Sequence, residues 1–349
     1  MTCPERRRGL IVALNALTVA CGANAESDAR LQEMRIREAA VVAARVAIPS
    51  GISPENDGFG FALAMDLRVS GSSLAVLENG NSRIVVFDSL FRAIRTIGRD
   101  GAGPGELRGA FSMDAGPGFY AVAEINNARI SIFDTSGVFQ RSLGAPGDAA
   151  FAFGPDGVLY MASGSVDHYL SRVDPEGLRQ PFGDRPLHLY PVPVQRDRVP
   201  PGVGRELVAV GPAGDVFVFD RALAGLVRFG SDGARRGLTV LPSALREGLL
   251  EHQRRVYADF GDRRPVYEVA AGDLTVTDSG RLLLLFPAVE RTFGLLIDPD
   301  GGLATRLEWS EGSEEAARGA AGGFGVLEGS RLYRGLGDEV TVYQLGAAR

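Results

Sequence analysis

The sequence contains no lysine: all 37 of its basic residues are arginines. A lysine Schiff base is therefore excluded, and so is the lysine of a loop that cradles nucleotide phosphates. The formal net charge at pH 7 is −6. An acidic balance of this kind does not provide the basic surface that binds nucleic acid, so we expect no nucleic-acid partner.

Cysteine is almost absent as well. The two cysteines, Cys3 and Cys21, both lie near the N-terminus, so the chain after Cys21 contains no thiol. That part of the chain cannot form a disulfide, a cysteine-ligated zinc site or a cysteine nucleophile.

Residues 1–20 have the pattern of a lipoprotein-type signal peptide. Arg6–Arg8 form a positive segment, and Gly9–Ala20 form an apolar segment, which is too short for a membrane-spanning helix of about 20 residues. Leu17–Cys21 (LTVAC) resembles the lipobox of bacterial lipoproteins, whose cysteine becomes the acylated first residue of the mature chain. This resemblance implies lipidation of Cys21. Ordinary cleavage after Ala25 is the alternative.

The lipobox resemblance also implies a location. Gly22 rather than an aspartate follows Cys21, which by similarity to Gram-negative lipoproteins indicates an outer-membrane anchor in the cell envelope. We expect contact with the membrane through this lipid anchor only. A soluble periplasmic or secreted protein is the alternative. We interpret residues 21–38 as a tether, because residues 26–35 are polar and charged.

Two stretches of the chain are nearly the same. Leu74–Gly98 and Tyr120–Gly144 share an acid, an arginine, a Phe-Asp pair and a final glycine, each 46 residues apart. A fixed period made of short apolar runs and turns is typical of a repeat architecture. Four further units follow by strand pattern, with recurring turns such as Asp134-Thr-Ser-Gly137 and Asp174-Pro-Glu-Gly177.

These six units predict an all-β fold, a six-bladed β-propeller of four-stranded antiparallel blades over residues 39–346. The sixth unit has only three strands before the chain stops. The apolar run Ala39–Ile48 (AAVVAARVAI) is predicted to supply the missing outer strand and to close the ring, because an open blade would expose a strand edge.

The repeated stretches resemble NHL repeats. The resemblance lies in Asn81-Ser-Arg83-Ile with Phe87-Asp88, and in Asn127-Ala-Arg129-Ile with Phe133-Asp134. It implies a six-bladed fold that proteins of many functions share, so it does not by itself imply an activity.

Four long segments fall on one face of the predicted propeller, where the blade-to-blade connections and the loops between second and third strands meet. We call this face the loop rim, and the opposite face, with the tight Asp-Gly and Gly-Pro turns, the turn rim. The four segments are Arg99–Gly109, Asp184–Gly204, Pro242–Val266 and Ser310–Ala321. Long loops on a rigid scaffold are where function usually lies.

Three carboxylates are predicted where second strands meet the loop rim: Glu78, Glu124 and Asp220. A ring of them would suit Ca²⁺, which takes oxygen ligands, although no cofactor is expected. The alternative is that each acid caps its own loop or pairs with Arg83 or Arg129.

Histidines do not provide a clear metal site. Some NHL-like lyases hold zinc with three histidines from equivalent loops, whereas His168, His188 and His252 come from dissimilar segments. We expect surface or locally bonded histidines, and no Ser-His-Asp arrangement is apparent.

We therefore predict a non-catalytic binding or assembly scaffold of the cell envelope, with an unidentified protein, peptide or carbohydrate ligand. The alternative is a metal-dependent hydrolase or lyase of the lactonase-like or NHL-like propeller type, with Ca²⁺ or Zn²⁺.

One helix is predicted at 242–262, between the fourth and fifth blades. Leu245, Leu249, Val256 and Phe260 recur at helical spacing. An apolar stripe of this kind cannot enter the packed sheets, so we expect it on the loop rim, beside the channel mouth and against the proline-rich loop at Leu187–Pro201.

Overall fold

The structure is a computed structural model of the chain. Its described residues are 31–45, 64–146, 149–190, 204–259, 266, 268–286, 293–308, 324–336 and 339–345. The chain divides into two compact units, Met1–Arg30 and Leu31–Arg349, and every described residue belongs to the second. The predicted signal peptide and Cys21 lie outside the described residues. Within them, no helix has the length and apolar character needed to cross a membrane.

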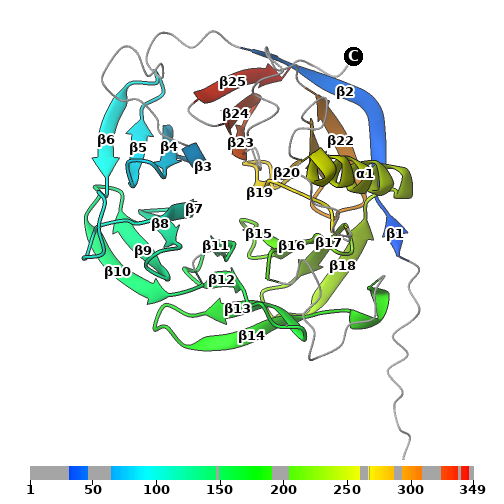
Figure 1. The fold of residues 1–349 in the computed structure, drawn as a ribbon, viewed down its shortest axis with the longest axis horizontal. Helices are drawn as coiled ribbons and strands as arrows, with labels where there is room; N and C mark the ends of the chain where they lie inside the picture. The colour runs from blue at the N-terminus through cyan, green and yellow to red at the C-terminus, as the bar shows by residue number, and fades with distance from the viewer. Residues whose placement is uncertain are drawn as a thin grey trace, which may run out of the picture. The chain divides into compact units, whose positions relative to one another are not determined.

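Six blades of antiparallel strands stand in a ring, which confirms the predicted six-bladed β-propeller (Figure 1). Blade 1 contains β3 (Ala64–Ser70), β4 (Ser73–Glu78), β5 (Arg83–Phe87) and β6 (Ala93–Ile97). Blade 2 contains β7 (Ala110–Gly116), β8 (Phe119–Glu124), β9 (Arg129–Asp134) and β10 (Phe139–Gly144). Blade 3 contains β11 (Phe151–Phe153), β12 (Leu159–Ala162), β13 (His168–Val173) and β14 (Arg179–Asp184), followed by the short helix η1 (Leu187–Leu189).

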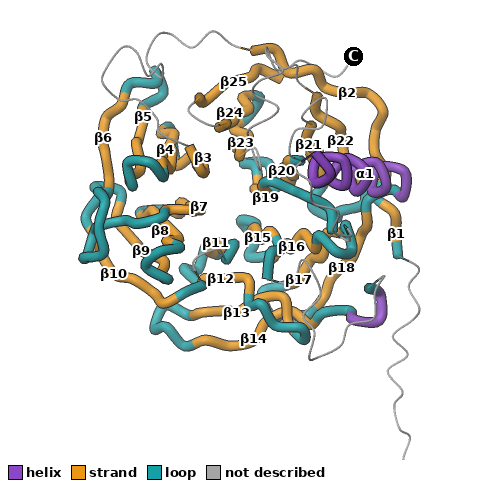
Figure 2. The backbone as a smooth tube through the Cα atoms, in the orientation of Figure 1, coloured by secondary structure: helices purple, strands orange, loops and turns teal. Residues whose placement is uncertain are grey.

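The remaining blades follow the same order from the channel outwards. Blade 4 contains β15 (Leu207–Val210), β16 (Val216–Asp220), β17 (Gly225–Phe229) and β18 (Arg235–Val240). Blade 5 contains β19 (Asp273–Val276), β20 (Leu282–Leu285), β21 (Phe293–Ile297) and β22 (Leu303–Glu308). Blade 6 contains β23 (Phe324–Glu328), β24 (Arg331–Leu336) and β25 (Glu339–Leu345). Strands dominate the described chain (Figure 2).

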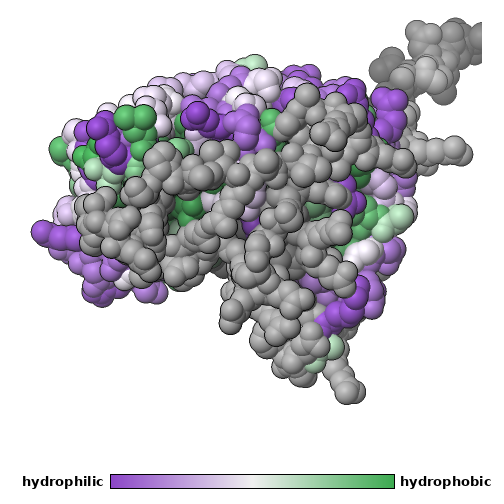
Figure 3. Space-filling view, turned by 90° about the horizontal axis from the view of Figure 1, so that it is seen from above, coloured by the Kyte–Doolittle hydropathy of each residue, from purple (hydrophilic) through white to green (hydrophobic). Residues whose placement is uncertain are grey.

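Apolar side chains fill the spaces between neighbouring blades. Each of the six blade-to-blade interfaces has its own buried cluster. The middle strands explain why, because both faces of β16 and β20 are buried along their whole length. Each fully buried apolar side chain contributes roughly 1.5–3 kcal/mol to the free energy of unfolding, relative to leaving it in water. On the side seen in Figure 3, the described surface is mostly hydrophilic.

The tight turns form as their residues predict. In the turn after β9, the Asp134 Oδ1 atom accepts hydrogen bonds from the backbone N–H groups of Ser136 and Val138, at 2.9 and 3.0 Å. Gly137 closes the turn by donating to the Asp134 carbonyl at 2.9 Å. Its φ of 90° lies in the left-handed region, which glycine adopts without a steric penalty.

The N-terminal strand closes the ring, as predicted. β2 (Arg35–Arg45) pairs antiparallel with β25 through Ala43–Arg45, which completes blade 6. Its earlier residues pair in parallel with β22 of blade 5. β1 (Gln32–Glu33) pairs in parallel with β18 of blade 4. Residues 32–33 and 35–38, which we expected within the tether, therefore lie in strands. We call β1 and β2 together the strap, since they run along the outer edges of blades 4, 5 and 6 (Figure 1).

The predicted helix is present as α1 (Ser243–Asp259), but its position differs from the expectation. Leu249 and Leu250 are buried in the interface between blades 4 and 5, together with Met34 of the strap. Figure 1 places α1 over the outer part of blade 5, away from the channel. In the described part of the proline-rich loop, η1 packs against Ala222 and Leu223. The rest of that loop lies outside the described residues, so the expected contact stays a prediction. The side chain of Val256, and Phe260, lie outside the described residues.

Candidate functional site

Glu78 lies at the end of β4 and is fully buried. Its carboxylate accepts a hydrogen bond from the Asn81 side chain and one from Arg83 Nε at 2.6 Å. Because Arg83 begins the next strand, the acid fixes the loop between β4 and β5. These contacts agree with the alternative prediction for Glu78, that it pairs with Arg83.

Glu124 repeats this arrangement in blade 2 and extends it. The carboxylate accepts hydrogen bonds from Arg129 Nε at 2.8 Å, Ser131 Oγ at 2.5 Å and the Arg108 N–H at 3.0 Å. Arg129 in turn donates through Nη2 to the carbonyls of Gly103 and Glu106, at 3.0 and 2.8 Å. Glu124 therefore orients an arginine that holds the glycine-rich connection between blades 1 and 2 in place.

Asp220 at the end of β16 belongs to a buried network between blades 3 and 4. Its Oδ2 accepts hydrogen bonds from the hydroxyls of Tyr169, at 2.8 Å, and Tyr190. Its Oδ1 accepts from the N–H groups of Ala222 and Leu223, at 2.9 and 3.0 Å. Burial, followed by the charge of Asp220, raises the pKa of both tyrosines, so both hydroxyls remain donors at neutral pH.

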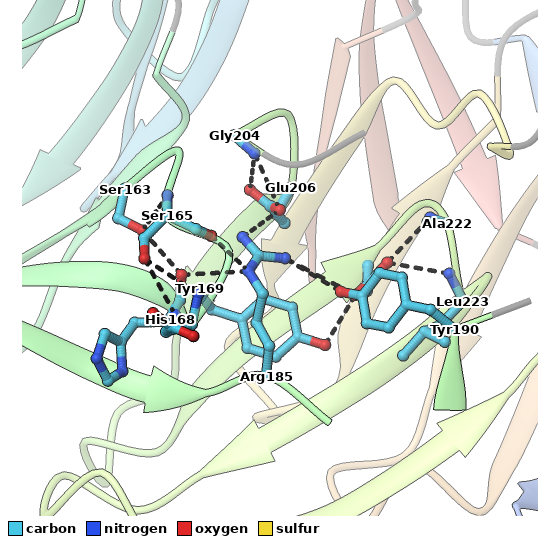
Figure 4. Close-up of polar contacts among 12 residues, drawn as sticks. Ser163, Ser165, His168, Tyr169, Arg185, Tyr190, Gly204, Glu206, Ala222 and Leu223 are labelled. Carbon is cyan, nitrogen blue, oxygen red and sulfur yellow. Dashed lines mark hydrogen bonds and ion pairs between the residues drawn. The ribbon is translucent and has the colours of Figure 1, made fainter. Parts of the chain in front are cut away.

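An ion pair completes this network. Arg185 Nη2 lies 2.5 Å from Glu206 Oε1, and both side chains are almost fully buried. Figure 4 shows Arg185 between Glu206 and the two tyrosine rings, and its guanidinium carbon lies 4.3 Å from the centre of the Tyr169 ring. Burial raises the pKa of Glu206, and the charge of Arg185 opposes that rise. The network joins two blades at the loop rim.

The three predicted carboxylates thus serve three separate loops rather than one common point. Among the described residues, no group of three or more His, Cys, Asp or Glu side chains is arranged to hold a metal ion. The histidines are also apart in the fold: His168 Nδ1 contacts Asp184 Oδ1 at 3.0 Å, His188 lies in η1, and His252 lies in α1.

The structure reveals a second charged cluster, in the channel, that the sequence analysis missed. Arg68 on β3 contacts three aspartates from three blades. Its Nη1 lies 2.5 Å from Asp66 Oδ1 and 3.6 Å from Asp273 Oδ2, and its Nε lies 3.7 Å from Asp114 Oδ1. We call these four residues the channel cluster.

Each aspartate of the channel cluster also links two blades. Asp66 accepts a hydrogen bond from the N–H of Met113 in blade 2, at 2.7 Å. Asp114 accepts one from Phe153 in blade 3, at 2.7 Å, and Asp273 accepts one from Gly325 in blade 6, at 3.3 Å. The carboxylates therefore connect inner strands that make no sheet hydrogen bonds to one another.

Burial dominates the protonation of these aspartates. It raises the pKa of Asp66 to about 7, with the charge of Arg68 opposing the rise and that of Asp273 adding to it. Burial also raises the pKa of Asp114 and of Asp273. One arginine among three carboxylates leaves the cluster negative when all are ionised, which favours a proton on one of them.

Arg68 separates two cavities along the channel. One, of about 450 Å³, is lined by the ends of the inner strands and opens towards the turn rim. The other, of about 390 Å³, is lined by the beginnings of the inner strands at the loop rim. We call the latter the mouth cavity.

The mouth cavity has a mixed lining, with apolar residues such as Phe111 and Phe151 beside the polar residues Asp66, Arg68, Ser112, Arg205, Glu206, Arg221 and Asp273. Two of its polar atoms, Ser112 Oγ and Arg221 Nε, are buried and lack a hydrogen-bond partner among the described residues. A buried polar atom without a partner costs about 1–3 kcal/mol, so the polar groups beside this cavity are not fully satisfied by the described residues.

One sequence signal could have identified the channel cluster. The dipeptide Met-Asp occurs at residues 65–66 and again at 113–114, at the start of two successive units. Its spacing of 48 residues differs from the common period of 46 by two, so the two dipeptides do not occupy equivalent positions of the repeat. Asp273 carries no such signal.

No protein-family model matches the sequence, and a comparison with curated proteins finds no match. Among solved structures, a member of the DUF4221 family from Bacteroides vulgatus is similar, with a TM-score of 0.58, 12% identity and coverage of 88% of this chain and 98% of that one. A Bacteroides fragilis protein described as exported has a TM-score of 0.53, 11% identity and coverage of 90% and 99%. A gluconolactonase from Xanthomonas campestris has a TM-score of 0.50, 14% identity and coverage of 82% and 87%. At these identities the likeness extends to the fold alone: the chain is a six-bladed β-propeller.

Proposed function

We propose that this protein is a non-catalytic binding module of the bacterial cell envelope, which takes its ligand at the mouth cavity on the loop rim. The observation that carries the proposal is the charged lining of that cavity, in which Ser112 and Arg221 each have a buried polar atom without a hydrogen-bond partner among the described residues. The rigid ring of blades holds this wall in place, so little ordering is needed when a ligand binds.

The proposed location rests on the lipobox resemblance around Cys21 and on the likeness to an exported propeller. Lipid anchoring at Cys21 would attach the domain to the outer membrane. A scaffold role also agrees with the charged groups of the loop rim, because Glu78, Glu124 and Asp220 are each bonded within the loops that they support.

Binding to the immobilised protein would test this function. Peptide, glycan and protein fractions of an envelope extract are measured by biolayer interferometry against the wild type, Arg205→Gln at the mouth, and Asp278→Asn at the turn rim as the control. Arg205 is well exposed and contacts only Glu268 among the described residues, at 3.9 Å, so its replacement should leave the fold intact. Binding that Arg205→Gln weakens and Asp278→Asn preserves would support the proposal. Binding that neither variant changes would contradict it. Turnover of a lactone or ester with added Ca²⁺ or Zn²⁺ would also contradict it.

A further inference from the structure

Phe91 adopts an unusual backbone conformation on the turn rim. Its φ is 59°, in the left-handed region, where a side chain crowds the backbone. The other non-glycine residues with a positive φ in the described part of the chain are Ser82, Ala128 and Ala224, and all three are small. Phe91 is therefore the one bulky residue in this conformation among the described residues.

The equivalent turns of other blades show what this position requires. Phe91 lies in the turn between β5 and β6, where its N–H donates to the Asp88 carbonyl at 2.9 Å. Blades 2 to 5 make the same backbone hydrogen bond, and each has a glycine with positive φ in this place, namely Gly137, Gly177, Gly233 and Gly301. Glycine would form the turn of blade 1 with less strain, so the turn itself does not explain the aromatic side chain.

Phe91 lines a cavity of about 320 Å³ between blades 1 and 6, which are neighbours in the ring (Figure 1). Tyr333 of β24 lines the same cavity, and its ring centre lies 6.2 Å from that of Phe91. Phe91 packs against the buried cluster between these blades but remains partly exposed. Small-molecule sites commonly have volumes of about 300–1,000 Å³, so this cavity is large enough for one ring of a ligand.

Most of the remaining lining is polar. Four serines contribute hydroxyl groups to it, Ser72, Ser73, Ser89 and Ser330. The two acids of the lining have basic neighbours, because Asp88 pairs with Arg92 at 2.6 Å and Glu328 lies opposite Arg331 in the sheet. The Tyr333 hydroxyl donates to Glu328 Oε2 at 3.1 Å. Acids and arginines in balance favour an uncharged ligand with hydroxyl groups over an ion.

A sugar ring combines the groups that suit this cavity. The face of an aromatic ring is negative and attracts the polarised C–H groups on the face of a sugar, whose hydroxyls can bond with serines and carboxylates. We propose that the cavity between blades 1 and 6 is a saccharide-binding site, in which Phe91 and Tyr333 contact the sugar ring. This site is on the opposite rim from the mouth cavity and does not depend on the function proposed there.

Saturation-transfer NMR with the purified full chain tests for this site. The probes are four neutral sugars, glucose, galactose, mannose and N-acetylglucosamine. Tetramethylammonium is added because a cation can also bind an aromatic face. We expect at least one of the sugars to bind with a Kd on the order of 1 mM, and tetramethylammonium to bind more weakly than that sugar.

Variants locate the site. Phe91→Gly gives blade 1 the glycine of the equivalent turns and should weaken sugar binding about tenfold. Glu328→Gln keeps the size of its side chain and should also weaken binding. Val138→Ala is the control, because Val138 is 58% exposed on the turn rim of blade 2 and does not line the cavity; it should bind sugar like the wild type. Circular dichroism checks that each variant is folded.

Three results would overturn the inference: no binding of any of the four sugars, an equal loss in Val138→Ala, or no effect of Phe91→Gly. If Phe91→Gly does not fold, Glu328→Gln decides in its place. Tighter binding of tetramethylammonium than of every sugar would also overturn the inference. Its failure is separable from failure of the proposed function, because sugar binding at this site should not change in Arg205→Gln.

Discussion

The Asp66 carboxylate accepts a hydrogen bond of 2.7 Å from the backbone N–H of Met113, so a side chain of blade 1 holds the main chain of blade 2. It also accepts from the N–H of Leu67, at 2.7 Å, and pairs with Arg68. Three contacts therefore meet at this one carboxylate.

Asp66→Asn should reduce the free energy of unfolding by about 1–3 kcal/mol, because an amide has one acceptor oxygen where the carboxylate has two. Urea unfolding measures this change. Asp232→Asn is the matched control, since Asp232 pairs with Arg236 on the surface and surface pairs contribute about 0–1 kcal/mol. Equal losses in the two variants would contradict a structural role for Asp66.

Stability should also depend on pH through this residue. Because burial raises the pKa of Asp66 from 3.8 to about 7, the folded protein binds its proton more tightly than the unfolded chain does. The stability linked to this group is therefore complete below about pH 4 and is lost as pH rises through about 7. Asp114 and Asp273 act with the same sign.

Urea unfolding of the wild type and Asp66→Asn across this pH range measures the effect. We expect the wild type to lose more of its unfolding free energy with rising pH than the variant. Parallel pH profiles would show that Asp66 does not titrate as described.

The strap can be tested at one side chain. Met34 is 2% exposed and belongs to the buried cluster between blades 4 and 5, whereas Leu31, three residues earlier, is 38% exposed. Met34→Ala should cost about 2–5 kcal/mol of unfolding free energy, because it leaves a cavity in a packed interface. Leu31→Ala should change little. Similar melting temperatures for both variants would place the strap outside the core.

A variant of Glu124 tests whether this residue is a structural acid or a calcium ligand. Glu124→Gln leaves Arg129 and its contacts to the glycine-rich connection without a buried counter-charge, so we expect a loss of about 3–5 kcal/mol. We also expect the wild-type melting temperature to be unchanged by millimolar Ca²⁺. A Ca²⁺-dependent rise in the wild type that Glu124→Gln abolishes would revive the calcium reading, since a bound ion stabilises the folded state.

The lipid anchor is tested by Cys21→Ser. If Cys21 is acylated, this variant should leave the membrane fraction and become soluble, because the chain offers no polybasic segment to replace the lipid. Membrane fractionation with immunodetection measures it, and Cys3→Ser is the control. An unchanged membrane fraction for Cys21→Ser would contradict the lipoprotein prediction.

The sequence predicted the architecture because each blade repeats local signals. Short apolar runs specify strands, and turns such as Asp134–Gly137 specify where they reverse. The count of blades, the three-stranded last unit and its closure by an N-terminal strand all follow from these signals. The start of the strap was harder to predict, because exposed residues such as Gln32 and Glu33 resemble a polar tether yet pair through their backbone alone.

The candidate site was less predictable. The pairing of Glu78 with Arg83 lies within one loop, so spacing anticipates it. The channel cluster unites residues as distant as Asp66 and Asp273, and their convergence depends on how the ring closes. Likewise, Ser112 and Arg221 are ordinary residues in the sequence, and only the structure shows that both line the same cavity.

The strap also determines when the ring can be completed. β2 is synthesised before its partner strands β22 and β25, which lie between Leu303 and Leu345. It therefore remains without them until roughly 250–300 further residues have been made. At 5–20 residues per second this is a delay of roughly 10–60 s. Throughout that time an apolar segment has no native neighbour and is open to wrong pairing with other strands. A chaperone that keeps the N-terminal segment from pairing with other strands until the last strand has been synthesised would therefore favour correct folding of this chain.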